Sequence, residues 1–189
     1  MTKILTRLSA INFIGLVLAS VLGSLTGISF LYPEWSYTSS MLHVSVSLLF
    51  VFVTLGIHCL IFIYFLGTGR WVKEVTLAYG MPDEPWHKRT RELKRATFPP
   101  ALFSMLIGIA AAAAGAGAHQ ELQAWPWYVH MTLGLLTLLI NLWAFRIELR
   151  NVAENAGIID AVKHETDRIR AVHGLPTSEE ALANAEESQ

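Results

Sequence analysis

The chain has 189 residues, of which 53% are hydrophobic and only 15% are charged. An average soluble chain carries roughly 25% charged residues, so this composition argues against an ordinary water-soluble globular protein. The formal net charge of -1 says little, because the charges are sorted along the chain. Cys59 is the only cysteine, which excludes an intrachain disulfide.

Four long apolar stretches predict membrane-spanning helices, at residues 9–31, 40–67, 98–118 and 125–146. A helix needs about 20 apolar residues to cross a hydrocarbon core roughly 30 Å thick, and each stretch meets that length. The first stretch is longer than the ~7–15-residue core of a signal peptide and no A-x-A site follows it, so we expect it to remain as an anchor. We expect the thiol of Cys59, within the second stretch, to be buried.

The basic residues predict the orientation of these helices. Lys3 and Arg7 precede the first stretch, further Lys and Arg residues lie between the second and third, and the rest close or follow the fourth. The connections at residues 32–39 and 119–124 contain no basic residue. Because basic loops stay cytoplasmic during insertion, we expect both termini and the middle loop to be cytoplasmic. This is the pattern of a multi-pass protein of a bacterial-type cytoplasmic (inner) membrane.

Small residues on the first and third stretches predict close packing. A smooth face lets a neighbouring helix approach, and tight packing is favoured over a wide cavity. The small residues are Gly15, Ala19, Gly23 and Gly27 on the first stretch, and Gly108, Ala112 and Gly115 on the third.

The polar segments are predicted to be cytoplasmic. Residues 69–97 are interpreted as a long loop of mixed charge, with the third helix beginning at about 91–96 and Pro99 and Pro100 in its first turn. Residues 151–189 form a cytoplasmic segment after the four-span domain of residues 1–150.

Within that cytoplasmic segment, apolar residues at three- or four-residue multiples indicate an amphipathic helix, which Gly174 and Pro176 end. These residues are Ile158, Val162, Ile169 and Val172. Residues 178–189 are acidic and expected to be disordered. The predicted fold is therefore an all-α integral membrane protein, a four-helix transmembrane bundle with a C-terminal amphipathic helix.

Histidines are the informative residues of the spans, because an ionisable side chain in hydrocarbon is costly and indicates function. His43 lies about four residues inside the outer end of the second helix, and His130 about five residues inside that of the fourth. Both helices run from outside to inside, so the two imidazoles are expected at nearly equal depth. His119 lies slightly above them, and His58 lies in the inner half.

Two histidines at matched depth on two helices are what a haem with two axial imidazoles requires. In this respect the chain resembles the b-type membrane cytochromes, whose ligands come from parallel helices of one bundle. The resemblance covers only His43 and His130, and implies that they bind haem b. Cytochromes with two haems place a second histidine lower on both ligand helices, whereas this chain has His58 on one but Ala144 and Phe145 on the other. The resemblance therefore implies one haem.

Other roles for the histidines remain open. Met105 lies near the depth of His58, so a His–Met site is an alternative there. A second interpretation of His58 is a packing residue with Ser47, Thr54 or Asn141 as its hydrogen-bond partner. For His43 and His130, the alternative is that they are interfacial histidines that bind no ligand.

Three functions from different classes follow. The first is an electron-transfer subunit with one haem in the outer leaflet, passing electrons between a quinone pool and a partner. The second is a Zn, Cu or Fe site in which His43, His119 and His130, with Glu34 or Glu121, are ligands, and His58 is a further candidate. The third is a ligand-free accessory subunit. Whether the chain is itself an enzyme is left open.

The lipid bilayer is the one partner common to all three functions. A membrane-protein partner or a second copy of the chain is also expected, and no nucleic acid. A transporter is less favoured, because the middles of the spans lack Asp, Glu, Lys and Arg.

Overall fold

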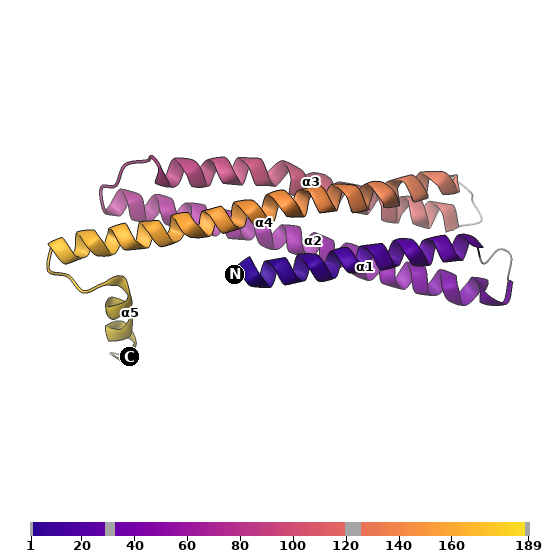
Figure 1. Cartoon of the computed structure of the whole chain (residues 1–189), viewed down its shortest axis with the longest axis horizontal. Coiled ribbons are helices and arrows are strands. Elements are labelled where there is room, and N and C mark those ends of the chain that lie inside the picture. Colours follow the sequence, from indigo (N-terminus) through magenta and orange to yellow (C-terminus); the bar gives the residue numbers. More distant parts are fainter. Residues whose placement is uncertain (1, 29–32, 120–125, 188–189) are drawn as a thin grey trace. The chain divides into compact units, whose positions relative to one another are not determined.

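The computed structural model describes residues 2–28, 33–119 and 126–187, which are helical apart from short turns. The helices are α1 (Thr2–Ile28), α2 (Pro33–Ala78), α3 (Trp86–His119), α4 (Trp127–Val172) and α5 (Ser178–Glu187) (Figure 1). The prediction of an all-α fold is confirmed for this part of the chain.

Four of these helices are long and apolar enough to cross a membrane, namely those that contain Thr2–Thr26, Tyr37–Ala78, Trp86–Ala118 and Trp127–Val172. This finding supports the expected multi-pass membrane protein. The helices α2 and α4 each have 46 residues. A helix of that length is about 69 Å long, about twice the thickness of a hydrocarbon core. A single crossing of such a layer would therefore use only part of each helix.

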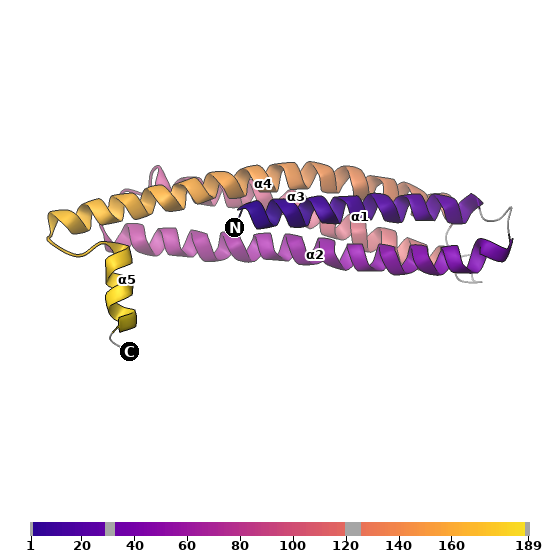
Figure 2. The ribbon, with the colours of Figure 1, turned by 60° about the horizontal axis from the view of Figure 1, so that its bottom comes forward.

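The chain forms two compact units. Unit 1 comprises Met1–Phe62 and Thr97–Leu149, and unit 2 comprises Ile63–Ala96 and Arg150–Gln189. In unit 1, α1 lies antiparallel beside the first part of α2, as Figures 1 and 2 both show. The helix α3 pairs with α4 in the same antiparallel way, through hydrogen bonds from Ser104 to Ile140 O and from Thr137 to Ile107 O.

Unit 1 buries polar as well as apolar side chains, and its exposed surface carries many large apolar side chains. Asn12, Thr54 and Asn141 are buried, whereas Phe52 and Leu139 are exposed by 63% and 64%. Water would penalise so much exposed apolar surface, but lipid does not. The thiol of Cys59 also lies on the exposed face, so the expectation that it is buried was wrong.

The small residues of α1 receive side chains from α2. A Cβ built on Gly15 would lie 2.1–2.3 Å from ring atoms of Phe50, so only glycine leaves room for that ring. This close approach agrees with the packing role predicted for the glycines, although a side chain rather than a backbone fills the space.

The connection between α2 and α3 is much shorter than predicted. The helix α2 continues to Ala78 and α3 begins at Trp86, so the prediction of a loop over residues 69–97 was wrong. Gly80 ends α2 with φ of 62°, and Met81 N donates to Thr76 O at 2.8 Å, which is the left-handed helix end that glycine favours. Pro99 and Pro100 lie inside α3 rather than in its first turn.

Unit 2 combines a small core with charged surfaces. Phe65, Val72 and Val162 are fully buried, and Asn155 donates from Nδ2 to the hydroxyl oxygens of Tyr64 and Thr68. On the surface, Arg89 pairs with Glu154 at 2.6 Å. Ionic surfaces of this kind are typical of segments in contact with water.

The end of the chain differs from the prediction in two ways. Residues 151–172 are the second half of α4 rather than a separate helix. The helix ends at Val172, and Gly174 follows in a left-handed conformation (φ 67°), in agreement with the predicted stop. The tail was expected to be disordered, but residues 178–187 form α5.

A capping box begins α5. Thr177 Oγ1 accepts from Glu180 N, and Glu180 Oε2 accepts from Thr177 N. Ser178 N and Oγ donate to Asp167 Oδ1, at 2.8 and 2.6 Å. These bonds tie α5 to α4, and the hydrogen bonds from Ser178 lower the pKa of Asp167.

Candidate functional site

The structure brings His43 and His130 together. The helices α2 and α4 run in the same direction in unit 1, and the centroids of the two imidazole rings lie 5.9 Å apart with their planes at 65°. Both rings are half-buried. The matched depth expected from the sequence therefore becomes direct proximity of the two side chains.

Each ring is oriented by a backbone carbonyl of the adjacent helix. His43 Nδ1 lies 3.0 Å from Ala19 O on α1, and His130 Nδ1 lies 2.9 Å from Ala111 O on α3. A carbonyl oxygen only accepts, so both Nδ1 atoms must carry the hydrogen. In the neutral ring, Nε2 then keeps its lone pair, which is the form in which histidine binds a metal.

Glycines give the imidazoles access to these carbonyls. In a helix, a side chain leans back over the preceding turn. It therefore covers the backbone carbonyl of the residue four positions earlier in the chain. The residue four positions after Ala19 is Gly23, and four after Ala111 is Gly115. A Cβ on either glycine would lie 2.8 Å from Cε1 of the facing histidine. In both antiparallel pairs, α1 with α2 and α3 with α4, an Ala-x-x-x-Gly spacing on the first helix therefore leaves room for a histidine of the second.

We expect alanine at Gly23 or Gly115 to displace the facing imidazole. The added methyl group overlaps Cε1, and it covers the carbonyl that holds Nδ1. Any ligand bound by both rings should be held at least about tenfold more weakly, the usual effect of losing a partner that orients a metal ligand. Gly134→Ala is the matched control, because a Cβ there meets nothing within 4 Å. Equal ligand retention in all three variants, measured by spectroscopic or metal titration, would contradict this role for the glycines.

The remaining outer-face candidates lie outside the description. Glu121 is not among the described residues, and the side chains of Glu34 and His119 are not described either. Among the residues that are described, no group of three or more His, Cys, Asp or Glu side chains is placed to hold a metal ion. The described part of this site is thus a two-histidine site.

His58 has a different environment, deep in unit 1. Its Nδ1 lies 2.7 Å from Glu148 Oε1 and its Nε2 lies 3.2 Å from Asn141 Oδ1, so both ring nitrogens have partners. The ring of Phe145 stacks on it with centroids 5.2 Å apart. The predicted bond to Asn141 is confirmed, whereas Glu148 was missed. With both nitrogens engaged, His58 offers no free lone pair to an iron or to a His–Met site.

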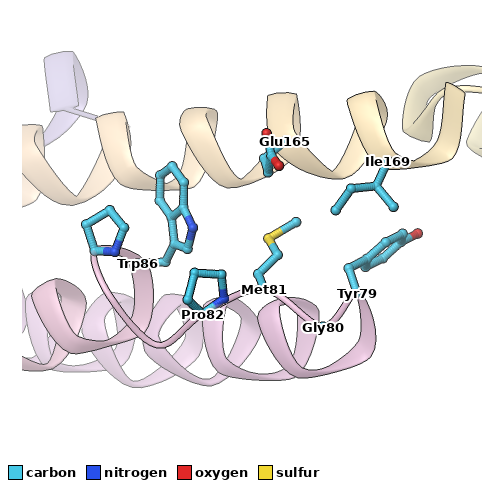
Figure 3. A pocket seen from close by; sticks show the side chains of 8 residues that line it. Tyr79, Gly80, Met81, Pro82, Trp86, Glu165 and Ile169 are labelled. Atoms are coloured by element: carbon cyan, nitrogen blue, oxygen red, sulfur yellow. The ribbon is translucent and has the colours of Figure 1, made fainter. Parts of the chain in front are cut away.

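A cleft of about 380 Å³ lies in unit 2. Tyr79 and Met81 in the α2–α3 connection and Trp86 at the start of α3 line this cleft, opposite Glu165 and Ile169 on α4 (Figure 3). Glu165 is already paired with Arg168. The cleft therefore presents apolar surface without converging polar groups, and it contributes nothing to the histidine site.

Comparisons with known proteins give no guide to this site: no family model, no curated protein and no solved structure matches the chain.

Proposed function

We propose that the protein is a membrane-embedded electron-transfer subunit in which His43 and His130 bind one haem b. The observation that carries this proposal is the pair of half-buried imidazoles whose Nδ1 atoms are both held by helix carbonyls. The Nε2 atoms are thereby left as ligands. An iron porphyrin would supply the redox chemistry, while this chain provides ligation, orientation and an apolar surround.

The distance between the rings fits this assignment. Imidazole nitrogens bind a metal at about 2.0 Å, so one iron held by both Nε2 atoms would require the two rings to lie close together. The observed separation is 5.9 Å. A haem iron needs only two protein ligands, because the porphyrin occupies four positions. A zinc site usually needs three or four protein ligands.

The distribution of basic residues supports an orientation for this subunit. With Lys and Arg kept on the cytoplasmic side, both termini are cytoplasmic and the histidine pair lies in the outer leaflet of an inner membrane. A haem there is placed to exchange electrons with a quinone and with a partner at the outer face. Any substrate chemistry then belongs to that partner.

The absorption spectrum of the purified protein, oxidised and then reduced, tests this function. A Soret band and a sharp α band of the b type on reduction are expected. A colourless protein with stoichiometric Zn, Cu or Fe would overturn the haem and favour a small-metal site. A protein with neither haem nor metal would favour a ligand-free accessory subunit.

The orientation can be tested by cysteine labelling in a background that carries Cys59→Ala. A cysteine at Asp83, exposed in the α2–α3 connection, should react with a membrane-impermeant maleimide only after spheroplasts are lysed. A cysteine at Thr38, exposed near the start of α2, is the opposite control and should react in intact spheroplasts. The reverse result at both positions would overturn the orientation.

A further inference from the structure

His58 and Glu148 form an ionisable pair that the electron-transfer proposal does not use. Both side chains are fully buried, with relative exposures of 0%. They lie on α2 and α4, fifteen and eighteen residues beyond His43 and His130, which is more than about 20 Å along each helix. Ionisable groups at such positions are costly and usually serve proton or ion chemistry.

The hydrogen bonds fix how many protons the pair holds. Asn141 Nδ2 donates to Thr137 O at 2.8 Å, so its Oδ1 faces His58 Nε2, and that nitrogen must carry a hydrogen. The bond between His58 Nδ1 and Glu148 Oε1, at 2.7 Å, contains one more proton. Whichever atom owns that proton, the pair is neutral overall. Neither bond can lose its proton without leaving a buried negative charge.

The second carboxylate oxygen of Glu148, Oε2, is free to accept a hydrogen bond or a proton. Glu148 Oε2 is buried and has no hydrogen-bond partner, and the same holds for Ser9 Oγ and Asn12 Oδ1 on α1. Asn12 Nδ2 donates to Thr54 Oγ1 at 2.8 Å, which sets the register of the antiparallel helices α1 and α2. One turn further along, Ser9 reaches the level of His58. Unpartnered polar atoms thus lie within about one helical turn of the level of His58, and proteins usually bind water or a functional proton at such groups.

We propose that the His58–Glu148 pair is a proton-exchange site within the membrane, and that Glu148 Oε2 is the atom that gains and loses the proton. A hydronium ion gives its proton to Oε2 and leaves as water, with no electron transferred. The charge of the pair changes from zero to plus one, and both existing hydrogen bonds stay intact. The proton comes from the aqueous phase at the end of the bundle where Arg7 and Arg146 lie.

No other buried ionisable side chain competes with this pair among the described residues of unit 1. Residues 97–118 of α3 contribute only neutral side chains, including the buried Thr97 and Ser104. Asn12, Thr54 and Asn141 are neutral. The other titratable groups among the described side chains of this unit are the half-buried His43 and His130, which are distant, and a set of exposed side chains. The exposed ones are Lys3, Arg7, Tyr37, Cys59, Tyr128 and Arg146.

Infrared difference spectroscopy of the full-length protein in lipid, recorded between two pH values, tests the proposal. As the pH falls, the carbonyl band of a protonated buried carboxyl should grow. This band should be absent from Glu148→Gln. Glu154→Gln is the matched control, because that carboxylate lies at the surface beside Arg89, and it should retain the band. A wild-type spectrum that is identical to that of Glu148→Gln at every pH would overturn the proposal.

Two measurements on the wild-type protein keep the test independent of how the variant folds. Labelling glutamate carboxyls with ¹³C should shift the band, and a band that does not move belongs to another group and overturns the assignment. Replacing sodium by choline should leave the band unchanged. A band that follows sodium rather than pH would make the pair a cation site instead. All these readouts are obtained without haem, so a failure of the electron-transfer proposal would not affect them.

Discussion

Replacing His43 or His130 by alanine is expected to abolish haem retention. If the proposal is right, each variant removes one of the two imidazoles that would hold the haem, and even losing a group that only orients a ligand typically weakens metal binding about 10- to 100-fold. We therefore expect a loss greater than about 100-fold, measured as the haem-to-protein ratio and the Soret intensity after purification. His58→Ala should leave the spectrum nearly unchanged, because both nitrogens of that ring are bonded to Glu148 and Asn141.

A chemical rescue separates ligation from a purely structural role. In His43→Gly or His130→Gly, free imidazole can occupy the space of the missing ring and bind the iron, so added imidazole should restore the b-type spectrum. A histidine that only packs against Gly23 or Gly115 would not produce imidazole-dependent recovery. If both alanine variants kept an unaltered haem spectrum, the ligand assignment would be wrong.

The four long apolar helices could be predicted from sequence because a run of about 20 apolar residues is visible directly in the hydropathy of the chain. The ends of the helices could not be predicted in this way, because apolarity stops where the membrane stops, whereas backbone hydrogen bonds continue. The helix α2 thus runs on to Ala78 through a polar segment that was interpreted as a loop. The tail contains a sequence signal for a helix in the capping-box spacing of Thr177 and Glu180, which the prediction of disorder from acidic composition did not use.

The proximity of His43 and His130 could also be predicted from the sequence. The depth of each histidine in the membrane follows from counting residues along two helices that run in the same direction. The partners of those rings could not be predicted, since Ala19 O and Ala111 O are backbone atoms without a sequence signature. Glu148 was missed because the fourth span was drawn to end at residue 146. On the fourth helix, only a second histidine opposite His58 was considered, at Ala144 and Phe145, one turn before the carboxylate that binds His58.

Breaking the buried pair should cost far more stability than any surface change. Leucine at position 58 leaves the Glu148 carboxylate buried without its partner, which typically costs about 3–5 kcal/mol. Denaturant titration in micelles should show this as a lower midpoint. The deficit should shrink as the pH falls, because a protonated carboxyl buries no charge. The surface variant Glu154→Ala, which loses only the exposed pair with Arg89, should cost about 0–1 kcal/mol.

The double variant His58→Leu/Glu148→Leu decides whether the pair is present for stability or for function. Replacing a buried ion pair by apolar residues of similar size is often neutral, or stabilises by about 1–4 kcal/mol, because the desolvation penalty of both ions disappears. We therefore expect the double variant to unfold at a denaturant concentration at least equal to that of the wild type. It should also lack the pH-dependent carboxyl band. A double variant as unstable as His58→Leu would mean that the pair holds the bundle together, and its burial would then need no proton chemistry to explain it.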